Sequence, residues 1–424
     1  MIDYSSYNSD SSGQQALASG CTALNKDSKI YVAGHRGLVG SAIWNNLLSR
    51  GYNNLVGRTH AELDLTDQVA VKRFFDEEQP EAVVLAAAFV GGIMANSLYR
   101  ADFIMMNMKI QCNVISESYA HGVKKLLFLG STCIYPKNAP QPMTEDSLLT
   151  SPLEYTNEEY AIAKIAGLKM CESYNLQYGT NYIAVMPTNL YGPNDNFHLE
   201  NSHVMPAMMR KIYLAKLIHE GDWKSIAHDL DKRPVEGVSG EGLEQDGDAP
   251  GTREKARQRV LEVLAKYGIY DNDVELWGTG TPLREFLWSE DMADASVHVL
   301  LNVNFSDIIG IEKYSSVFYG TRADGEVNRN TSEGRGGAIP SLGEIRNCHI
   351  NVGTGKELTI RELSELIVKT VGFEGTVRFN TSKPDGTPRK LIDVSKLHRL
   401  GWHHKVEIDE GVRRLYDWYR QSIL

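Results

Sequence analysis

Cysteine is scarce in this chain of 424 residues. The five cysteines (Cys21, Cys112, Cys133, Cys171 and Cys348) are odd in number, scattered and never in a C-x-x-C pair. This pattern disfavours a disulfide framework and a cysteine-based zinc site, and it suits a reducing compartment. The sequence therefore predicts a cytoplasmic protein without a metal site.

The sequence also lacks a segment that predicts a membrane span. Its longest apolar run, residues 82–95, has 14 residues and contains two glycines, whereas a spanning helix needs about 20 apolar residues. Residues 1–28 are rich in Ser, Asn and Gly and lack the basic start and apolar core of a secretory signal. We expect a flexible N-terminal extension over residues 1–28 and no membrane partner.

Positive charge is not in excess. Lys and Arg number 44 against 54 for Asp and Glu, which gives a formal net charge of −10. This balance disfavours a general nucleic-acid surface, although a local basic pocket for phosphates stays open. The length suits two domains or one large one.

A glycine-rich turn follows the first expected strand. Residues 29–33 (KIYVA) predict a buried strand, the next seven (GHRGLVG) a turn, and residues 41–51 a helix. Glycines at such a turn let the backbone approach a pyrophosphate, whose charge meets the helix N-terminus. The turn therefore predicts a dinucleotide site at Gly34, His35, Arg36, Gly37, Leu38, Val39 and Gly40.

Basic residues follow the second expected strand, which ends at residues 55–56. Arg58 stands where an NAD-specific site usually has an acid for the ribose hydroxyl. Together with Arg36 and His60 it would suit the 2′-phosphate of NADP, because arginine contacts phosphate bidentately. The alternative is that Arg58 is a solvated surface charge. We predict NADP, with the adenine beside Asp64 and Leu65.

Further strands and helices alternate along the first half of the chain. Residues 82–88 predict the fourth strand, 102–121 a helix, 126–129 a buried strand and 182–186 another strand. Asn107 and Asn113 in the long helix are more often packing residues than catalytic ones. This alternation predicts an α/β fold with a doubly wound parallel sheet of Rossmann type.

Ser131, Cys133, Tyr160 and Lys164 form the candidate catalytic set. The first two follow a strand, and the last two are four residues apart in an expected helix, so they share one face. A lysine ammonium beside a tyrosine hydroxyl favours the phenolate, and a serine hydroxyl can bind the same reacting oxygen. A bare Y-x-x-x-K also occurs on ordinary surface helices. The serine and the upstream glycine turn favour proton transfer at a carbonyl or alcohol centre.

The motifs GHRGLVG, GSTCIYP and YAIAKIAG resemble those of the extended short-chain dehydrogenase/reductase family that acts on nucleotide sugars. With AAAFVGGI, PTNLYGPNDNFH, NSHVMPA, GTGTPLREFL and SKPDGTPRKLIDV, they are similar to its bifunctional branch, the GDP-4-keto-6-deoxymannose epimerase/reductases. The similarity covers most of residues 29–402. It implies NADPH as cofactor, a GDP-sugar substrate and a homodimer.

The resemblance also implies residue roles. Cys133 would be the base and His203 the acid for epimerisation at C3 and C5, while Tyr160 would protonate the C4 oxygen during reduction. Taken singly, Cys133 is more often a small buried residue and His203 a packed or surface histidine, and a thiolate needs a nearby cation or helix terminus. The implied cofactor contacts also include Leu129, Gly130, Ser131, Thr132, Lys164, Pro187, Thr188, Asn189, Leu190 and His203. The implied substrate contacts are Lys211, Trp277, Arg284, Asp385 and Lys390. Lys211 and His60 stand where related proteins carry arginine.

Two alternatives remain. Another nucleotide-sugar epimerase or reductase would need neither Cys133 nor His203, and a non-catalytic protein of the same fold would have no need of Tyr160 or Lys164.

The domains are expected to divide near residue 200. Residues 29–200 would form the NADP-binding domain, completed by residues 277–303 and 349–353, and residues 201–424 mainly a smaller α/β substrate domain. Two longer stretches, about 219–273 and 304–339, predict surface excursions. Within the first, residues 235–251 predict a mobile loop and residues 253–266 an amphipathic helix.

Overall fold

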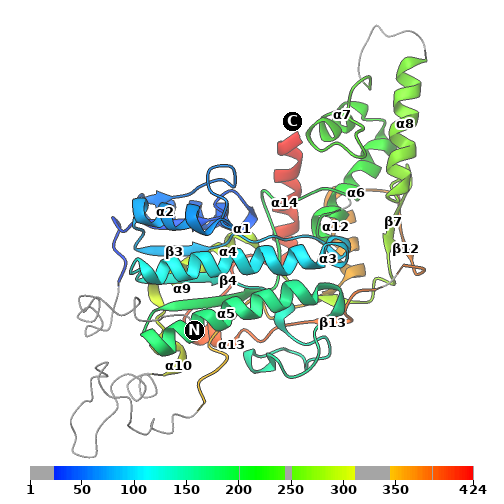
Figure 1. The fold of residues 1–424 in the computed structure, drawn as a ribbon. Helices are drawn as coiled ribbons and strands as arrows, with labels where there is room; N and C mark the ends of the chain where they lie inside the picture. The colour runs from blue at the N-terminus through cyan, green and yellow to red at the C-terminus, as the bar shows by residue number, and fades with distance from the viewer. Residues whose placement is uncertain (1–22, 200, 244–250, 311–343, 384, 424) are drawn as a thin grey trace, which may run out of the picture.

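The computed structural model describes residues 23–199, 201–243, 251–310, 344–383 and 385–423 (Figure 1). Most of the expected N-terminal extension lies outside these residues. Its last part does not fit the prediction of a flexible segment, because Leu24 and Ser28 are buried against the folded domain. Residues 235–243 of the expected mobile loop are described, and a mobile loop is wrong there because Val235 and Leu243 are buried. Residues 244–250 and most of the second excursion, residues 311–339, lie outside the described residues.

A six-stranded parallel sheet in the order β10-β5-β4-β3-β1-β2 forms the centre of the larger half of the molecule. The strands are β1 (Ile30–Ala33), β2 (Leu55–Val56), β3 (Ala82–Leu85), β4 (Lys125–Leu129), β5 (Tyr182–Pro187) and β10 (Ile350–Val352). The strand order reverses between β1 and β3, and ligands of such sheets bind beyond the carboxyl ends at this point. The predicted doubly wound fold is confirmed.

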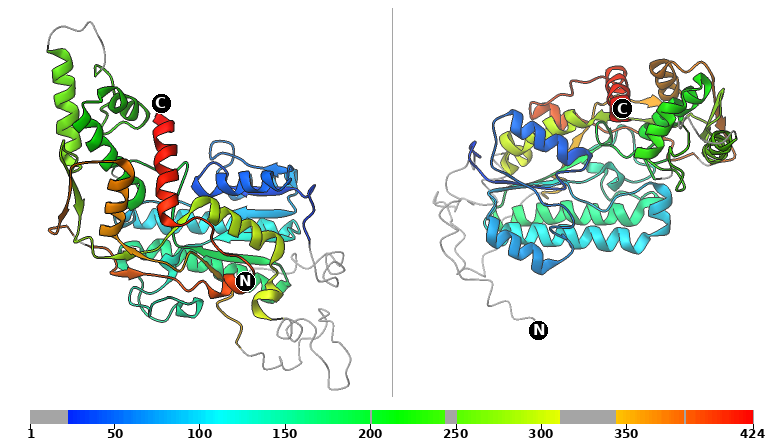
Figure 2. Two further views of the ribbon diagram at one scale, coloured as in Figure 1. Left: turned by 180° about the vertical axis from the view of Figure 1, so that it is seen from behind. Right: turned by 90° about the horizontal axis from the view of Figure 1, so that it is seen from above.

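Helices cover both faces of this sheet (Figure 2). One face carries α1 (Leu38–Ser49) and α9 (Ser289–Asn302), and the other carries α2 (Gln68–Glu78), α4 (Arg100–Ala120) and α5 (Glu158–Tyr178). Alternate side chains of each strand enter the two cores: Ile30 and Val32 face α1, whereas Tyr31 and Ala33 face α2 and α4. Burial on both faces explains the nearly continuous apolar sequence of the strands.

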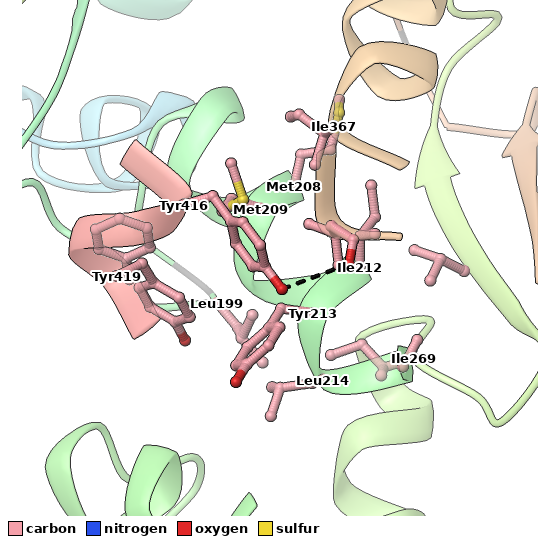
Figure 3. Close-up of a cluster of buried hydrophobic side chains, with 14 of the residues drawn as sticks. Leu199, Met208, Met209, Ile212, Tyr213, Leu214, Ile269, Ile367, Tyr416 and Tyr419 are labelled. Carbon is pink, nitrogen blue, oxygen red and sulfur yellow. Dashed lines mark hydrogen bonds between the residues drawn. The ribbon is translucent and has the colours of Figure 1, made fainter. Parts of the chain in front are cut away.

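The smaller half is built on short sheets and five helices of the described chain. The strands are β6 (Asn189–Tyr191) with β9 (Phe286–Trp288), β7 (Asp273–Trp277) with β12 (Thr376–Asn380), and β8 (Leu283–Arg284) between β11 (Leu358–Thr359) and β13 (Arg389–Lys390). The helices are α6 (Val204–Glu220), α7 (Trp223–Lys232), α8 (Thr252–Lys266), α12 (Ile360–Val371) and α14 (Ile408–Ile423). Their shared core includes Met209, Ile212, Tyr213, Tyr416 and Tyr419 (Figure 3).

Short elements complete the described chain. They are α3 (Ile93–Leu98), α10 (Phe305–Ile309), α13 (Ser395–Arg399) and the 3-10 turns η3 (Thr132–Ile134), η4 (Glu145–Ser147) and η5 (Tyr155–Asn157). None of the helices among the described residues is both long and apolar enough for a membrane crossing.

The prediction that residues 219–273 are a surface excursion is wrong. This stretch forms α7 and α8, and Ile226, Leu230 and Leu264 are buried in the core of the smaller half. Within the other excursion, α10 begins with the buried Phe305. The sequence did not predict this, because the polar loop between the two helices dominates the composition of the stretch.

The structure also sets boundaries that the sequence pattern does not. The expected fourth strand is the third, β3, and it ends at Leu85. The segment after β5 forms β6, which pairs with β9 in parallel. The Tyr160 helix runs to Tyr178 and stops where Gly179 takes a left-handed conformation (φ 69°). Strand pairing and helix length in these places depend on tertiary contacts that local pattern does not carry.

Candidate active site

The glycine turn lies between β1 and α1 at the reversal point of the sheet. Gly34 has a left-handed backbone (φ 85°), and a Cβ there would lie 2.8 Å from the Ala87 nitrogen. A Cβ on Gly40 would lie 2.0 Å from the Gly34 oxygen, so only glycine fits at either position. Gly37 precedes α1 without a side-chain cap, and no acid stands in the first turn, where Leu38 and Val39 lie. The helix N-terminus therefore suits a phosphate group.

The expected 2′-phosphate residues differ in how free they are. Arg58 donates to Glu78 Oε1 (2.5 Å) and to its own neighbour, the Gly57 carbonyl (3.0 Å). Arg36 is exposed and has no ion pair with any described residue. Sequence reasoning missed Glu78, which lies on α2 twenty residues after Arg58.

Two histidines and one aspartate are the other candidates near this phosphate position. The His35 ring packs over Gly57, where a Cβ would lie 2.6 Å from its Cγ, and burial together with Arg36 lowers the pKa of this histidine. His60 is 81% exposed, with Nδ1 3.9 Å from Asp64 Oδ1. The Thr66 amide and hydroxyl donate to Asp64, and the Thr66 amide is the main reason that the pKa of this carboxyl is lowered.

Two asparagines of α4 support the walls of the crevice. Asn113 donates to the carbonyl of the buried Leu65 (2.9 Å). Asn107 accepts from the Phe89 amide and donates to the Phe89 carbonyl, both at 2.9 Å. Both asparagines therefore hold backbone segments in place.

The carboxyl end of β4 brings the candidate catalytic residues together. Ser131 caps the turn η3, and its Oγ accepts from the Cys133 amide at 3.3 Å. Lys164 donates to the Leu129 carbonyl at 2.8 Å, which places its buried ammonium at the same strand end. Thr132 is buried in the turn, and the Gly130 amide donates to the Val185 carbonyl. Strand, turn and α5 thus converge on one point.

Burial dominates the electrostatics of this set. It lowers the pKa of Lys164 to about 8 and raises the pKa of Tyr160. The Lys164 ammonium lies 5.7 Å from the centroid of the Tyr160 ring. Burial also raises the pKa of Cys133, while Lys390, Ser131 and Lys164 oppose that effect. Tyr160 is therefore a neutral phenol at pH 7, suited to donate a proton.

The segment after β5 lies along the same sheet edge. The Thr188 amide donates to the Val352 carbonyl (3.0 Å), and Asn189 donates to the Glu285 carbonyl (2.8 Å). Pro187 ends β5, and Leu190 belongs to β6. Pro187 and Thr188 therefore lie beside β10, whereas Asn189 and Leu190 lie beside β9.

His203 is the exposed N-cap of α6, and desolvation lowers its pKa. Its neighbours Asn201 and Ser202 face the glycine pair after β3, because a Cβ on Gly92 would lie 3.9 Å from the Asn201 carbonyl oxygen. His203 therefore stands beside the carboxyl end of β3, on the edge of the sheet that also carries Ser131 at the end of β4. Neither His203 nor Cys133 is among the main causes of the other's pKa shift in the described structure.

The expected substrate residues fall into two groups. Lys211 on α6 faces Glu275 of β7, burial lowers its pKa to about 8, and Trp277 at the end of β7 is 58% exposed. The other group is Arg284, Asp385 and Lys390. Arg284 and Lys390 are cross-strand neighbours on β8 and β13, and Asp385 accepts from the Thr279 amide (2.9 Å).

Glu285 is a residue that sequence reasoning missed. It is fully buried, and its carboxylate accepts the amides of Thr354 (2.6 Å), Gly355 (2.8 Å) and Ile392 (3.1 Å). Burial raises its pKa to about 6. Its position beside Arg284 in the GTPLREF motif was the available signal. Glu285 fixes three chain segments around the substrate residues.

A small pocket opens at this point of the structure. Cys133, Tyr135 and Lys390 are among its lining residues. The part of the chain that the structure describes contains no cluster of three or more His, Cys, Asp or Glu side chains that could hold a metal ion. The arrangement suits proton transfer at a carbonyl or alcohol group that lies next to a dinucleotide.

The chain is similar to known proteins over nearly its whole length. The model of the NAD dependent epimerase/dehydratase family matches residues 30–231 and 238–310. GDP-L-fucose synthase 1 of Arabidopsis thaliana is 46% identical over 399 residues, 94% of this chain and 95% of that protein. GDP-L-fucose synthase of Escherichia coli (strain K12) is 45% identical over 394 residues, 93% and 97% of the two chains.

A solved structure extends the similarity to three dimensions. It is a GDP-D-glycero-L-gluco-heptose synthase from Campylobacter jejuni in the presence of NADPH. It is 41% identical, with a TM-score of 0.76, and the match covers 94% of this chain and 99% of that one. The chain belongs to the NAD dependent epimerase/dehydratase family.

Proposed function

We propose that this protein converts GDP-4-keto-6-deoxymannose into GDP-L-fucose, by epimerisation at C3 and C5 and NADPH-dependent reduction at C4. The convergence of Ser131, Cys133 and Lys164 at the end of β4 is the observation that carries the proposal. The relatives named GDP-L-fucose synthase support the choice of substrate. The glycine turn at the N-terminus of α1 fits the pyrophosphate of NADPH, whose contribution when bound is a hydride for C4.

The epimerisation half uses the acidity that a C4 ketone gives to its neighbouring carbons. Cys133 as thiolate removes the proton from C3 or C5, and the charge moves onto the C4 oxygen. Ser131 and Tyr160 hydroxyls donate to that oxygen and stabilise the enolate. His203 returns a proton from the opposite side of the sugar, which inverts the centre.

The reduction half uses the neutral phenol of Tyr160. As the C4 oxygen gains negative charge, Tyr160 gives it a proton. Lys164 stands over the Tyr160 ring and stabilises the phenolate that this transfer leaves. Arg284 and Lys390 on adjacent strands would hold the GDP pyrophosphate, with Lys211 and Trp277 on the other side of the nucleotide sugar.

The experiment that tests the proposal is incubation with GDP-4-keto-6-deoxymannose and NADPH. NADPH absorbance should fall as GDP-L-fucose appears, one equivalent of each. A product that retains the manno configuration at C3 and C5 would contradict the epimerase half.

A second candidate is the same chemistry on a GDP-heptose. The Campylobacter jejuni structure favours it, because that heptose synthase is 41% identical over 99% of its chain. Parallel assays with GDP-4-keto-6-deoxymannose and the corresponding 4-keto-heptose, compared by kcat/KM, separate the two.

We also propose that the protein is a cytoplasmic homodimer. Four cysteines in the described chain, Cys112, Cys133, Cys171 and Cys348, are free thiols, as a reducing compartment favours. The outer faces of α4 and α5 carry exposed apolar side chains, which supports an interface there.

A further inference from the structure

We infer that Lys390 is the cation that ionises Cys133, so that this lysine acts on the base of epimerisation as well as on the nucleotide. The inference deepens the proposed function and rests on it for the role of the thiolate. A reactive cysteine requires a nearby cation, and Lys390 would supply it.

Backbone pairing places Lys390 beside the turn that carries Cys133. Met143 forms a parallel bridge with Ile392, donating to the Leu391 carbonyl and accepting from the Asp393 amide, both at 2.8 Å. Gln141 Oε1 accepts from the Leu391 amide at 2.7 Å. These bonds hold the segment after β13 along the segment that follows η3.

The turn itself is fixed from the other side. The Tyr135 hydroxyl donates to Asn351 Oδ1 at 2.5 Å, which ties the residue two places after Cys133 to β10. Asn351 in turn donates to the Met143 carbonyl at 3.0 Å. Cys133 and Lys390 therefore line one pocket with little freedom to separate.

The other cations of that pocket are already neutralised. Lys137 pairs with Glu154 at 3.0 Å, and Arg389 pairs with Glu357 at 2.6 Å. Lys390 has no ion pair with any residue that the structure describes, and it is half-buried. Glu154, which also lines the pocket, acts on Lys390 electrostatically, but Lys390 is the cation of the described pocket that has no salt-bridge partner.

The remaining groups that face Cys133 do not replace Lys390. The Tyr160 phenol adds no positive charge, and the Ser131 hydroxyl and the Lys164 ammonium lower the pKa of Cys133 by less than Lys390 does. Charge interaction with Lys390 is the largest effect that lowers the pKa of Cys133 against its burial. Arg284, the cross-strand neighbour of Lys390, lowers the pKa of Lys390 and is not among the main causes of the pKa shift of the thiol.

The test measures the thiolate directly, without the GDP-sugar. Wild type and Lys390→Met are treated with iodoacetamide between pH 6 and 10, and alkylation of Cys133 is followed by peptide mass spectrometry. Loss of the cation should raise the midpoint by about one pH unit, a roughly tenfold slower alkylation at pH 7. Lys390→Arg keeps the charge and should restore most of the rate.

Two controls separate this role from nucleotide binding and from general disturbance. Lys137→Met removes a cation of the same pocket that is paired with Glu154, so its alkylation profile should match wild type. Arg284→Gln should weaken binding of GDP but leave the midpoint unchanged. Half-buried Cys112 reports in every sample on loosening of the fold.

An unchanged midpoint in folded Lys390→Met overturns the inference, as does an equal shift in Arg284→Gln. Both results concern the thiol alone, so they leave the proposed reaction standing. Conversely, inactivity of the wild type toward GDP-4-keto-6-deoxymannose would refute the proposed function without moving the alkylation profile.

Discussion

Burial sets protonation at the residues of this site more than pairing does. Lys164 and Lys211 each have a pKa near 8 because they are desolvated, and burial raises the pKa of Tyr160. The two lysines are therefore poised to lose their charge a little above neutral pH. Tyr160, by contrast, keeps its proton until the substrate takes it.

Tyr160→Phe and Cys133→Ser should separate the two half-reactions. Removing the Tyr160 hydroxyl takes away the proton donor for C4, which costs about 100-fold to 10,000-fold in reduction. Solvent deuterium should still enter at C3 and C5. Cys133→Ser should lose that exchange, because a serine hydroxyl does not ionise at neutral pH and so cannot act as the base. The variant should still reduce unepimerised substrate.

Mass spectrometry in deuterated water, with the product sugar identified, measures both effects. His203→Gln should behave like Cys133→Ser, since both residues belong to epimerisation. Undiminished GDP-L-fucose synthesis by Cys133→Ser would remove Cys133 from the role of base.

Arg36 should matter more than Arg58 for the choice of NADPH over NADH. Arg58 shares its charge with Glu78, whereas Arg36 has no ion pair with a described residue. A hydrogen bond to a charged group contributes about 1.5 to 3 kcal/mol, so Arg36→Gln should reduce the NADPH preference by at least about tenfold. The ratio of kcat/KM for the two cofactors is the measurement.

The corresponding Arg58→Gln variant is the matched comparison, and a smaller loss of preference is expected there. A larger loss in Arg58→Gln would mean that Glu78 releases the guanidinium when the cofactor binds. Equal use of NADPH and NADH by the wild type would refute the basis of the prediction.

The sequence predicts the types of the site residues better than their partners. Motif spacing was enough to select Ser131 and Lys164, because strand ends and helix faces are local properties. The pairing of Arg58 with Glu78 and the amide contacts of Glu285 depend on segments far apart in the chain. No local pattern encodes such contacts.

At the scale of elements, a buried ion pair joins α6 to α7. Arg210 donates to Asp229 Oδ2 through Nε (3.0 Å) and Nη2 (2.7 Å), and both side chains are fully buried. Tyr419 of α14 also donates to Asp229. Since α6 carries His203 at its start and Lys211 next to Arg210, this pair fixes the helix that presents two candidate site residues.

Asp229→Ala should destabilise the protein by about 3 to 5 kcal/mol, because it leaves Arg210 buried without a counter-charge. Urea unfolding measures the change. Glu220→Gln on α6 is the control: the exposed Glu220 lies 3.8 Å from Lys216, and this pair should contribute less than about 1 kcal/mol. Equal effects of the two variants would contradict the reading of the buried pair.

The helices α7 and α8 differ in how well the sequence predicts them. The amphipathic helix expected over residues 253–266 is present as α8 (Thr252–Lys266), whose buried side carries Val260, Val263 and Leu264. The core role of α7 was not foreseen, because its buried Asp229 reads as a surface acid until Arg210 is placed opposite.

For the whole molecule, the candidate site lies where the two halves meet. β4 and α5 bring Cys133 and Lys164 from the larger half, while β13 brings Lys390 from the smaller one. The buried Glu285 ties these parts together through the amides of Gly355 and Ile392. These amide contacts hold the segment that carries Lys390 in place beside the base.

The proposed homodimer would have its interface on α4 and α5. The helices α4 and α5 pack side by side on one face of the sheet (Figure 1). Their outer faces expose Met105 (54%), Ile162 (42%), Tyr119 and Tyr178. In a dimer with twofold symmetry, these side chains would pack against the same surface of the second subunit, and a fully buried side chain of this kind contributes about 1.5 to 3 kcal/mol.

The double variant Met105→Glu/Ile162→Glu should therefore be monomeric at micromolar concentration, by sedimentation equilibrium, where the wild type is a dimer. Val69→Glu is the matched control, because Val69 is 77% exposed on α2, and it should remain a dimer. A monomeric wild type refutes the homodimer, whereas a double variant that stays dimeric moves the interface to another face.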